Sequence, residues 1–152
     1  MNRCYGLVAG LLLGACAGPR DPLVVKQFKL RDLTTNKDDE PMMRMEKDRR
    51  FHGAVSMAER RARLGQYFTL IWNDPAGAGQ GEAELVFQYQ QGPTGSRIKR
   101  MVRTFPASDT RGTAEFAVIG DDYTKGGKVL TWKAILQRGK RVIASRQSYL
   151  WQ

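Results

Sequence analysis

The chain has 152 residues, which suffices for one domain with some length left for targeting. Hydrophobic residues make up 41% and charged residues 26%, a balance that excludes an intrinsically disordered chain and fits a globular domain. The formal charge of +10 attracts anions, whether nucleic acid, acidic lipid headgroups or polyanionic cell-wall material, and does not choose among them.

The first sixteen residues have the pattern of an export signal. Arg3 supplies a positive charge, and the apolar run 5–15 that follows is too short to cross a bilayer as a mature helix. This run leads into Leu13-Gly14-Ala15-Cys16, which resembles the lipobox of bacterial lipoproteins. The alternative is an ordinary secretory leader, or a buried apolar helix, in which Cys16 is incidental.

The lipobox resemblance implies that residues 1–15 are a signal peptide, that the chain is cut before Cys16, and that the Cys16 thiol and the new amine are acylated. Two acyl chains already anchor a protein stably to a membrane. In this family Asp after the cysteine often favours the inner membrane, so Ala17 implies the outer membrane. Residues 16–23 are then the lipidated cysteine and a Gly- and Pro-containing tether.

Cleavage also changes the charge and the cysteine content. Residues 1–15 contain Arg3 and no acid, so 24 basic and 15 acidic residues remain and the charge becomes +9. Cys4 leaves with the leader, and the one remaining cysteine, Cys16, carries lipid. The mature chain is therefore expected to have no disulfide, no CxxC redox pair and no cysteine metal site.

Residues 24–65 are predicted to form a first strand and short basic helices that pack on a sandwich. Alternating apolar residues in 23–33 indicate the strand. A run of acids followed by proline predicts the start of a helix over 41–51. Ser56 and Glu59 have the spacing of a capping box, which predicts a second short helix.

From residue 66 onward the apolar residues recur with a period of two. This pattern predicts six further strands, at 66–73, 82–90, 97–105, 112–119, 128–138 and 141–151. Turn-forming sequences separate them, including GDDYTKGG before the fifth. The expected fold is mainly β, with an antiparallel β-sandwich over 66–152. In strand number and length it resembles an immunoglobulin or fibronectin type III sandwich.

Most aromatic residues alternate with aliphatic ones and are expected to fill the sandwich core; a ligand-stacking platform is the alternative. These residues are Phe68, Trp72, Phe87, Tyr89, Phe116 and Trp132. Tyr149 and Trp151 lie on the last predicted strand, opposite in phase to Leu150. An exposed aromatic pair at that position is a candidate partner contact.

Two groups of cations are candidate contacts for an anion or a charged surface. The first shares one face of a predicted strand, with Ile98 and Val102 on the other face, and consists of Arg97, Lys99 and Arg103. A solvated outer sheet face, or an edge strand protected by cations, is the alternative. Arg100 breaks the alternation and is expected to pair with Glu82 or Glu84.

The second group crowds the helical region and includes Arg49, Arg50, Arg60 and Arg61, with Arg44, Lys47 and Arg63 nearby. Contact with anionic lipid or a polyanionic envelope polymer is one interpretation, since each charge near a membrane contributes about 1 kcal/mol. A pair of basic, solvent-facing helices is the other interpretation.

No catalytic set can be assembled from the mature sequence, which has one histidine, His52. We therefore expect a membrane-anchored envelope lipoprotein that acts as a non-enzymatic interaction or structural module, without cofactor or metal. Its partners are expected to be the membrane, through Cys16, and another envelope protein or polymer. A binding module for acidic lipid or cell-wall polymer is the alternative, followed by a small enzyme using Asp74, Asp121 or Asp122. Nucleic acid fits the charge but not this compartment.

Overall fold

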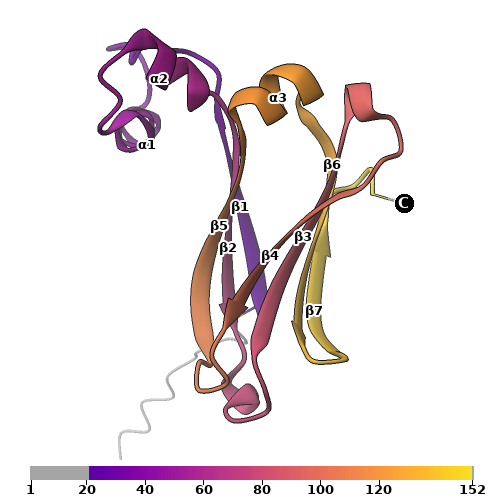
Figure 1. Ribbon diagram of the computed structural model, residues 1–152. Coiled ribbons are helices and arrows are strands. Elements are labelled where there is room, and N and C mark those ends of the chain that lie inside the picture. Colours follow the sequence, from indigo (N-terminus) through magenta and orange to yellow (C-terminus); the bar gives the residue numbers. More distant parts are fainter. Residues whose placement is uncertain (1–20, 152) are drawn as a thin grey trace, which may run out of the picture.

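Two antiparallel sheets face each other in the computed structural model, which describes residues 21–151 (Figure 1). One sheet has the strand order β1-β2-β5 and the other β4-β3-β6-β7. The strands are β1 (Leu23–Leu30), β2 (Gly65–Asn73), β3 (Ala83–Gln91), β4 (Lys99–Phe105), β5 (Arg111–Ile119), β6 (Val129–Arg138) and β7 (Arg141–Gln147). This arrangement confirms the predicted mainly β architecture of packed antiparallel sheets. The residues predicted to form a lipobox, Leu13, Gly14, Ala15 and Cys16, lie outside the described residues.

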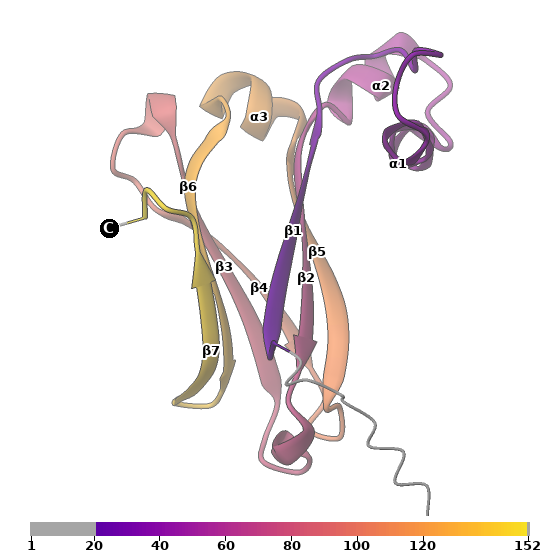
Figure 2. The same cartoon turned by 180° about the vertical axis from the view of Figure 1, so that it is seen from behind.

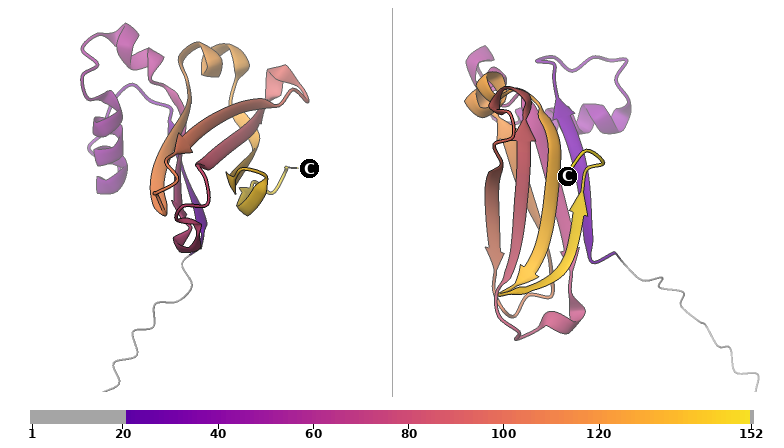
Figure 3. Two further views of the ribbon diagram at one scale, coloured as in Figure 1. Left: turned by 60° about the horizontal axis from the view of Figure 1, so that its bottom comes forward. Right: turned by 90° about the vertical axis from the view of Figure 1, so that its right-hand side faces the viewer.

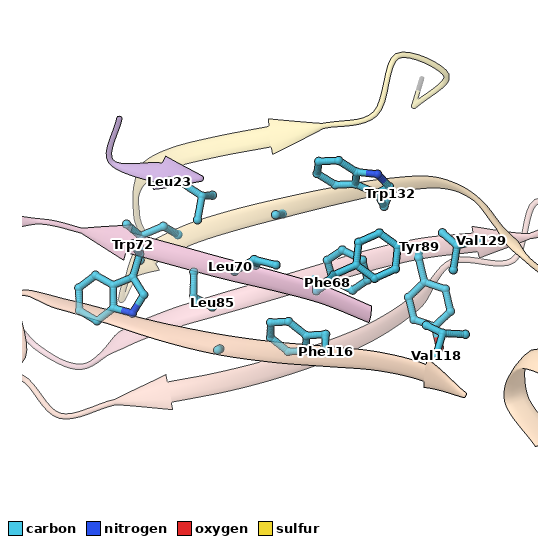
Figure 4. Close-up of a cluster of buried hydrophobic side chains, with 14 of the residues drawn as sticks. Leu23, Phe68, Leu70, Trp72, Leu85, Tyr89, Phe116, Val118, Val129 and Trp132 are labelled. Carbon is cyan, nitrogen blue, oxygen red and sulfur yellow. The ribbon is translucent and has the colours of Figure 1, made fainter. Parts of the chain in front are cut away.

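Aromatic side chains fill the space between the sheets (Figure 4). The ring of Phe87 lies 4.6 Å from Phe68 and 5.5 Å from Phe116, measured between centroids. Trp132 closes the same cluster, 6.1 Å from Phe68. All six aromatic residues predicted for the core are buried, so they stabilise the fold and do not form a ligand-stacking platform.

Helix α1 (Pro41–Phe51) lies beside the outer face of the three-stranded sheet, and α2 (Met57–Ala62) lies at the end of the sandwich (Figure 1). Phe51 packs on Leu30 and Tyr67 in a second, smaller apolar cluster. The predicted capping box is confirmed: the Glu59 N–H donates to the Ser56 hydroxyl at 3.1 Å, and the Ser56 N–H donates to the Glu59 carboxylate at 2.8 Å. Two short 3-10 turns, η1 (Pro75–Gly77) and η2 (Gly92–Thr94), lie in loops.

Three predicted features were wrong in detail. The first strand is part of the sandwich, because β1 pairs with β2 along its whole length. The sequence GDDYTKGG is not a turn but contains helix α3 (Gly120–Gly126), in which Asp121 and Lys125 form an ion pair one turn apart. Strand β7 ends at Gln147, because the Ser148 hydroxyl accepts the Trp132 N–H and the chain then turns.

The helices gather at one end of the sandwich and the described chain begins at the other (Figure 2). At the end of the sandwich opposite the helices, Asp21 forms an ion pair with Arg146 at 2.9 Å. The eight residues of β1 then carry the chain roughly 23 Å toward the helical end. The views in Figure 3 show α1 to the side of the three-stranded sheet, away from the four-stranded one.

Candidate functional site

Helix α1 exposes apolar side chains and buries cations. Met42 and Met45 are 81% and 73% exposed, and Met43 is also exposed, whereas Lys47 and Arg50 are buried. A surface helix ordinarily turns its apolar residues toward the core and its charges toward solvent. Contiguous exposed apolar side chains on a folded domain indicate an interaction surface.

Ion pairs to Arg50 attach the end of α1 to the sheet. The Arg50 guanidinium donates to the carboxylates of Glu46 and of Glu115, on β5, and lies 3.9 Å from the centroid of the Tyr67 ring. Arg49 donates to Glu46 at 2.6 and 2.8 Å. The hydrogen bonds from Arg49 and Arg50 outweigh burial and hold the pKa of Glu46 below its ordinary value. The cluster thereby fixes the position of α1 over the sheet.

Lys47 makes the second attachment. Its ammonium donates to Asp39 at 2.7 Å and lies 3.7 Å from a carboxylate oxygen of Asp32. The hydrogen bond from Lys47 lowers the pKa of Asp39. Since cations and the terminal Phe51 make these attachments, the methionines at the other end of α1 are left without a covering element.

The exposed methionines overhang a groove on the outer face of the three-stranded sheet. Met42 and Met43 form one wall, Phe28 and Ile71 lie on the sheet beneath them, and this part encloses about 410 Å³. A second hollow of about 510 Å³ continues from Ile71 past Val24 toward the end of the sandwich where Asp21 lies. Because Ile71 lines both hollows, they form one elongated depression, which we call the methionine groove and define by Val24, Lys26, Phe28, Met42, Met43 and Ile71.

The predicted basic surface of the helical region is only partly formed. Arg50 is buried, and its prediction as a surface contact was wrong because Glu115, 65 residues away in the sequence, pairs with it. Arg60 is half-buried, with its guanidinium over an aromatic ring of α1. Arg49 and Arg61 are exposed, and Arg49 is already paired with carboxylates.

Strand β4 turns the opposite face inward from the one predicted. Met101 and Phe105 pack against the core, while Ile98 and Val102 are exposed. Lys99 shares this inner face with Met101 and is paired with Asp122, so it is not a free cation beside Arg97 and Arg103. Arg97 precedes the strand, and Arg103 is exposed near its end.

The predicted partner of Arg100 was also wrong. Arg100 lies opposite Gln88 in the pairing of β4 with β3, whereas Glu84 lies four positions further along, opposite Thr104. The Glu84 carboxylate instead accepts a hydrogen bond from Gln137 at 2.8 Å. Arg100 therefore remains on the exposed face of an edge strand, where a cation opposes edge-to-edge aggregation.

Lys99 belongs to a polar cluster that fastens α3 to the four-stranded sheet. Its ammonium donates to Asp122 and, at 2.7 Å, to Gln91, and the Tyr89 hydroxyl donates to Asp122 at 2.7 Å. Burial would raise the pKa of Asp122, but the hydrogen bonds from Lys99 and Tyr89 outweigh it and lower that pKa. Burial and the contact with Asp122 raise the pKa of the Tyr89 hydroxyl. The charges neutralise one another, so the cluster has a structural explanation.

The two C-terminal aromatic residues do not form a pair on a strand. Tyr149 is 99% exposed and follows the end of β7, and Trp151 is half-buried after a turn at Ser148. The predicted exposure is confirmed for Tyr149. The C-terminal end lies on the far side of the sandwich from α1 (Figure 1), so these residues are separate from the methionine groove.

The carboxylates considered for an enzyme are dispersed. Asp74 forms a buried ion pair with Arg138, at 2.9 Å, near the end of the sandwich where Asp21 lies. Asp121 and Asp122 lie in α3 at the helical end. Within residues 21–151, no group of three His, Cys, Asp or Glu side chains is arranged to hold a metal ion. His52 ends α1, where its carbonyl accepts a hydrogen bond from Arg63.

Sequence reasoning missed the methionine groove. Three methionines within four positions of a predicted basic helix were the available signal, but the buried face of the helix depends on contacts with distant strands.

No helix of the described part of the chain combines the length and apolar character needed to cross a membrane. Searches of family models, curated proteins and solved structures find no match to this chain.

Proposed function

We propose that this protein is a lipid-anchored module of the bacterial cell envelope that binds another envelope component through the methionine groove and catalyses no reaction. The exposure of Met42 and Met43 beside Phe28 and Ile71 of the sheet carries the binding part of the proposal. The lipobox that ends at Cys16 carries the anchoring part. The dispersed positions of Asp74 and Asp122 support a role without catalysis.

The geometry of the domain is compatible with a short anchor. Five residue steps separate Cys16 from Asp21, and an extended chain of that length reaches at most about 18 Å. The starting end of the sandwich would then lie close to the bilayer. The groove runs from that end toward α1, so its methionine wall is the part furthest from the anchor along β1. That placement suits a partner approaching from the periplasmic side of the outer membrane.

We further propose that the sandwich belongs to the immunoglobulin or fibronectin type III type. Its support is the seven-stranded arrangement in which β1-β2-β5 faces β4-β3-β6-β7. Sandwiches of this kind serve many unrelated binding functions, so the fold is compatible with a binding module and does not specify the ligand.

An anionic envelope ligand is the second candidate. Exposed Arg61, Arg97 and Arg103, on a chain of strong positive charge, favour it. These residues belong to α2 and to the β4 region, and the ion pairs of Arg50 and Lys99 remove two of the expected contacts. Binding to such a polymer would weaken steeply between low and high salt, whereas binding to an apolar groove would change less.

Two cysteine variants test the anchoring. We would express wild type, Cys16→Ala and Cys4→Ala in a Gram-negative host and measure the N-terminal peptide mass in membrane and soluble fractions. The wild type and Cys4→Ala are expected in the membrane fraction with a lipid-modified Cys16, because Cys4 leaves with the leader. Cys16→Ala is expected to lack lipid and leave that fraction. Unmodified Cys16 in the wild type would contradict the proposal.

A further inference from the structure

We propose that the methionine groove recognises an acidic amphipathic segment of a partner protein, in which apolar side chains enter the groove and flanking carboxylates meet the cations along its rim. This inference rests on the proposed binding function and adds the chemistry of the partner. Its observations are the shape of the groove, the type of its apolar residues and the unequal pairing of the charges around it.

The shape of the groove favours a polypeptide segment. From Thr69 to Asn73, β2 alone gives the depression roughly 13 Å of length, which equals a little over two turns of an α-helix. Ile71 is 36% exposed and lines both hollows, so the depression is open to solvent, and the paired residues Lys26 and Thr69 lie between Ile71 and Phe28 on its floor. An open, elongated apolar channel fits side chains presented at regular intervals along a helix or strand.

The methionines favour a protein surface over a fixed small ligand. Methionine is unbranched and polarizable, and methionine-rich surfaces adapt their packing to protein partners. Met42 and Met43 form a wall of the groove while Met45 extends it along α1. A surface that binds a membrane would instead be convex and apolar, whereas Phe28 and Ile71 lie recessed on the sheet beneath α1.

The charges at the rim of the groove favour a partner segment with negative charge. Glu46 is bound by Arg49 and Arg50, and Asp21 is bound by Arg146, so the acids beside the groove are neutralised. Within residues 21–151, Lys26 and Arg111 form no ion pair, and each lines one of the two hollows. A partner carboxylate near either cation would gain a favourable contact, and a partner cation would be repelled.

Methyl NMR tests this inference with a built-in control. Beyond Met1 the chain has five methionines: four lie on α1 and α2, and Met101 packs against the core. We would label them with ¹³C-methyl groups and use the protein as isolated, in phosphatidylcholine nanodiscs if it is lipid-anchored and in buffer if it is not. The result for the groove is then independent of the result for the anchor.

The probe is a synthetic 16-residue helical peptide with leucine at i, i+3, i+4 and i+7 spacing and glutamate on its other face. It is expected to shift the methyl signals of Met42 and Met43 in a saturable way while leaving Met101 unchanged. The same peptide with lysine for glutamate is expected to bind at least tenfold more weakly. Lys26→Glu is expected to reduce or reverse the preference for the glutamate peptide over the lysine peptide.

Two further variants locate the binding. Ile71→Gln in the groove floor is expected to weaken the acidic peptide at least tenfold, and Val142→Gln, an exposed apolar position on β7, is expected to leave it unchanged. Equal binding of the two peptides, or no shift of Met42 and Met43, would overturn the inference. Shifts produced by nanodiscs containing phosphatidylglycerol, without peptide, would overturn it in favour of a lipid surface.

Discussion

Replacement of Arg138 is expected to destabilise the domain more than any surface substitution. The side chains of Arg138 and Asp74 are 1% and 7% exposed, and their ion pair joins the end of β6 to the loop after β2. Arg138 also donates to the carbonyls of Gly81 and Asp109, so one guanidinium holds three segments together. Arg138→Leu would leave Asp74 buried without its partner and these carbonyls without a donor.

The expected loss follows from these contacts. Removing one partner of a buried ion pair costs about 3–5 kcal/mol, because the remaining charge has lost its compensation. For the domain described by residues 21–151, the unfolding entropy is roughly 0.28 kcal/mol/K, so the melting temperature should fall by about 11–18 °C.

Thermal unfolding followed by circular dichroism measures this change. The control is the double variant Asp74→Leu with Arg138→Leu, which removes both charges and is expected to recover at least half of the loss, since buried pairs can often be replaced by apolar residues. A fall of less than about 3 °C for Arg138→Leu would refute the reasoning.

Three further predictions concern the backbone, a helix cap and acid stability. Gly65→Ala is expected to lower the free energy of unfolding by more than about 2 kcal/mol, because the new Cβ would lie 2.2 Å from the Val118 carbonyl oxygen. Gly79→Ala, at φ +72° with open space around the new Cβ, should lower it by about 1 kcal/mol in urea unfolding. Ser56→Ala should lower the free energy of unfolding by about 1 kcal/mol through loss of the capping box, and an unchanged urea midpoint would contradict this. The pKa of Asp122 lies below its ordinary value of 3.8, so the unfolded chain binds more protons near and below that pH, and stability should fall as the pH drops through this range. Equal stability at pH 7 and pH 3 would show that the lowered pKa makes no contribution.

Local sequence signals predicted much of the fold. Alternation located all seven strands, and the capping box of Ser56 and Glu59 located α2, because both signals depend on residues close together in the chain. Helix α3 was missed because its seven residues resemble a turn and depend on tertiary contacts such as that of Tyr89 with Asp122.

The orientation of elements was harder to predict than their existence. In β4 both faces carry apolar residues, so alternation did not decide whether Met101 or Val102 is buried; pairing with β3 decides it. In α1 the buried face is set by the ion pair of Arg50 with Glu115, which no local pattern reveals. The candidate site could not be predicted for the same reason, since it exists only where α1 crosses β1 and β2.

The most direct test of the account is site-specific photo-crosslinking in living cells. A photoreactive amino acid at Met45, at the rim of the groove, is compared with one at Val142 on β7, both exposed positions. The account predicts a discrete protein adduct from Met45 in the membrane fraction, absent from Val142 and lost when Ile71→Gln is added. Identical adducts from both positions, or an adduct from Met45 that persists with Ile71→Gln, would contradict the claim that this groove is the binding surface.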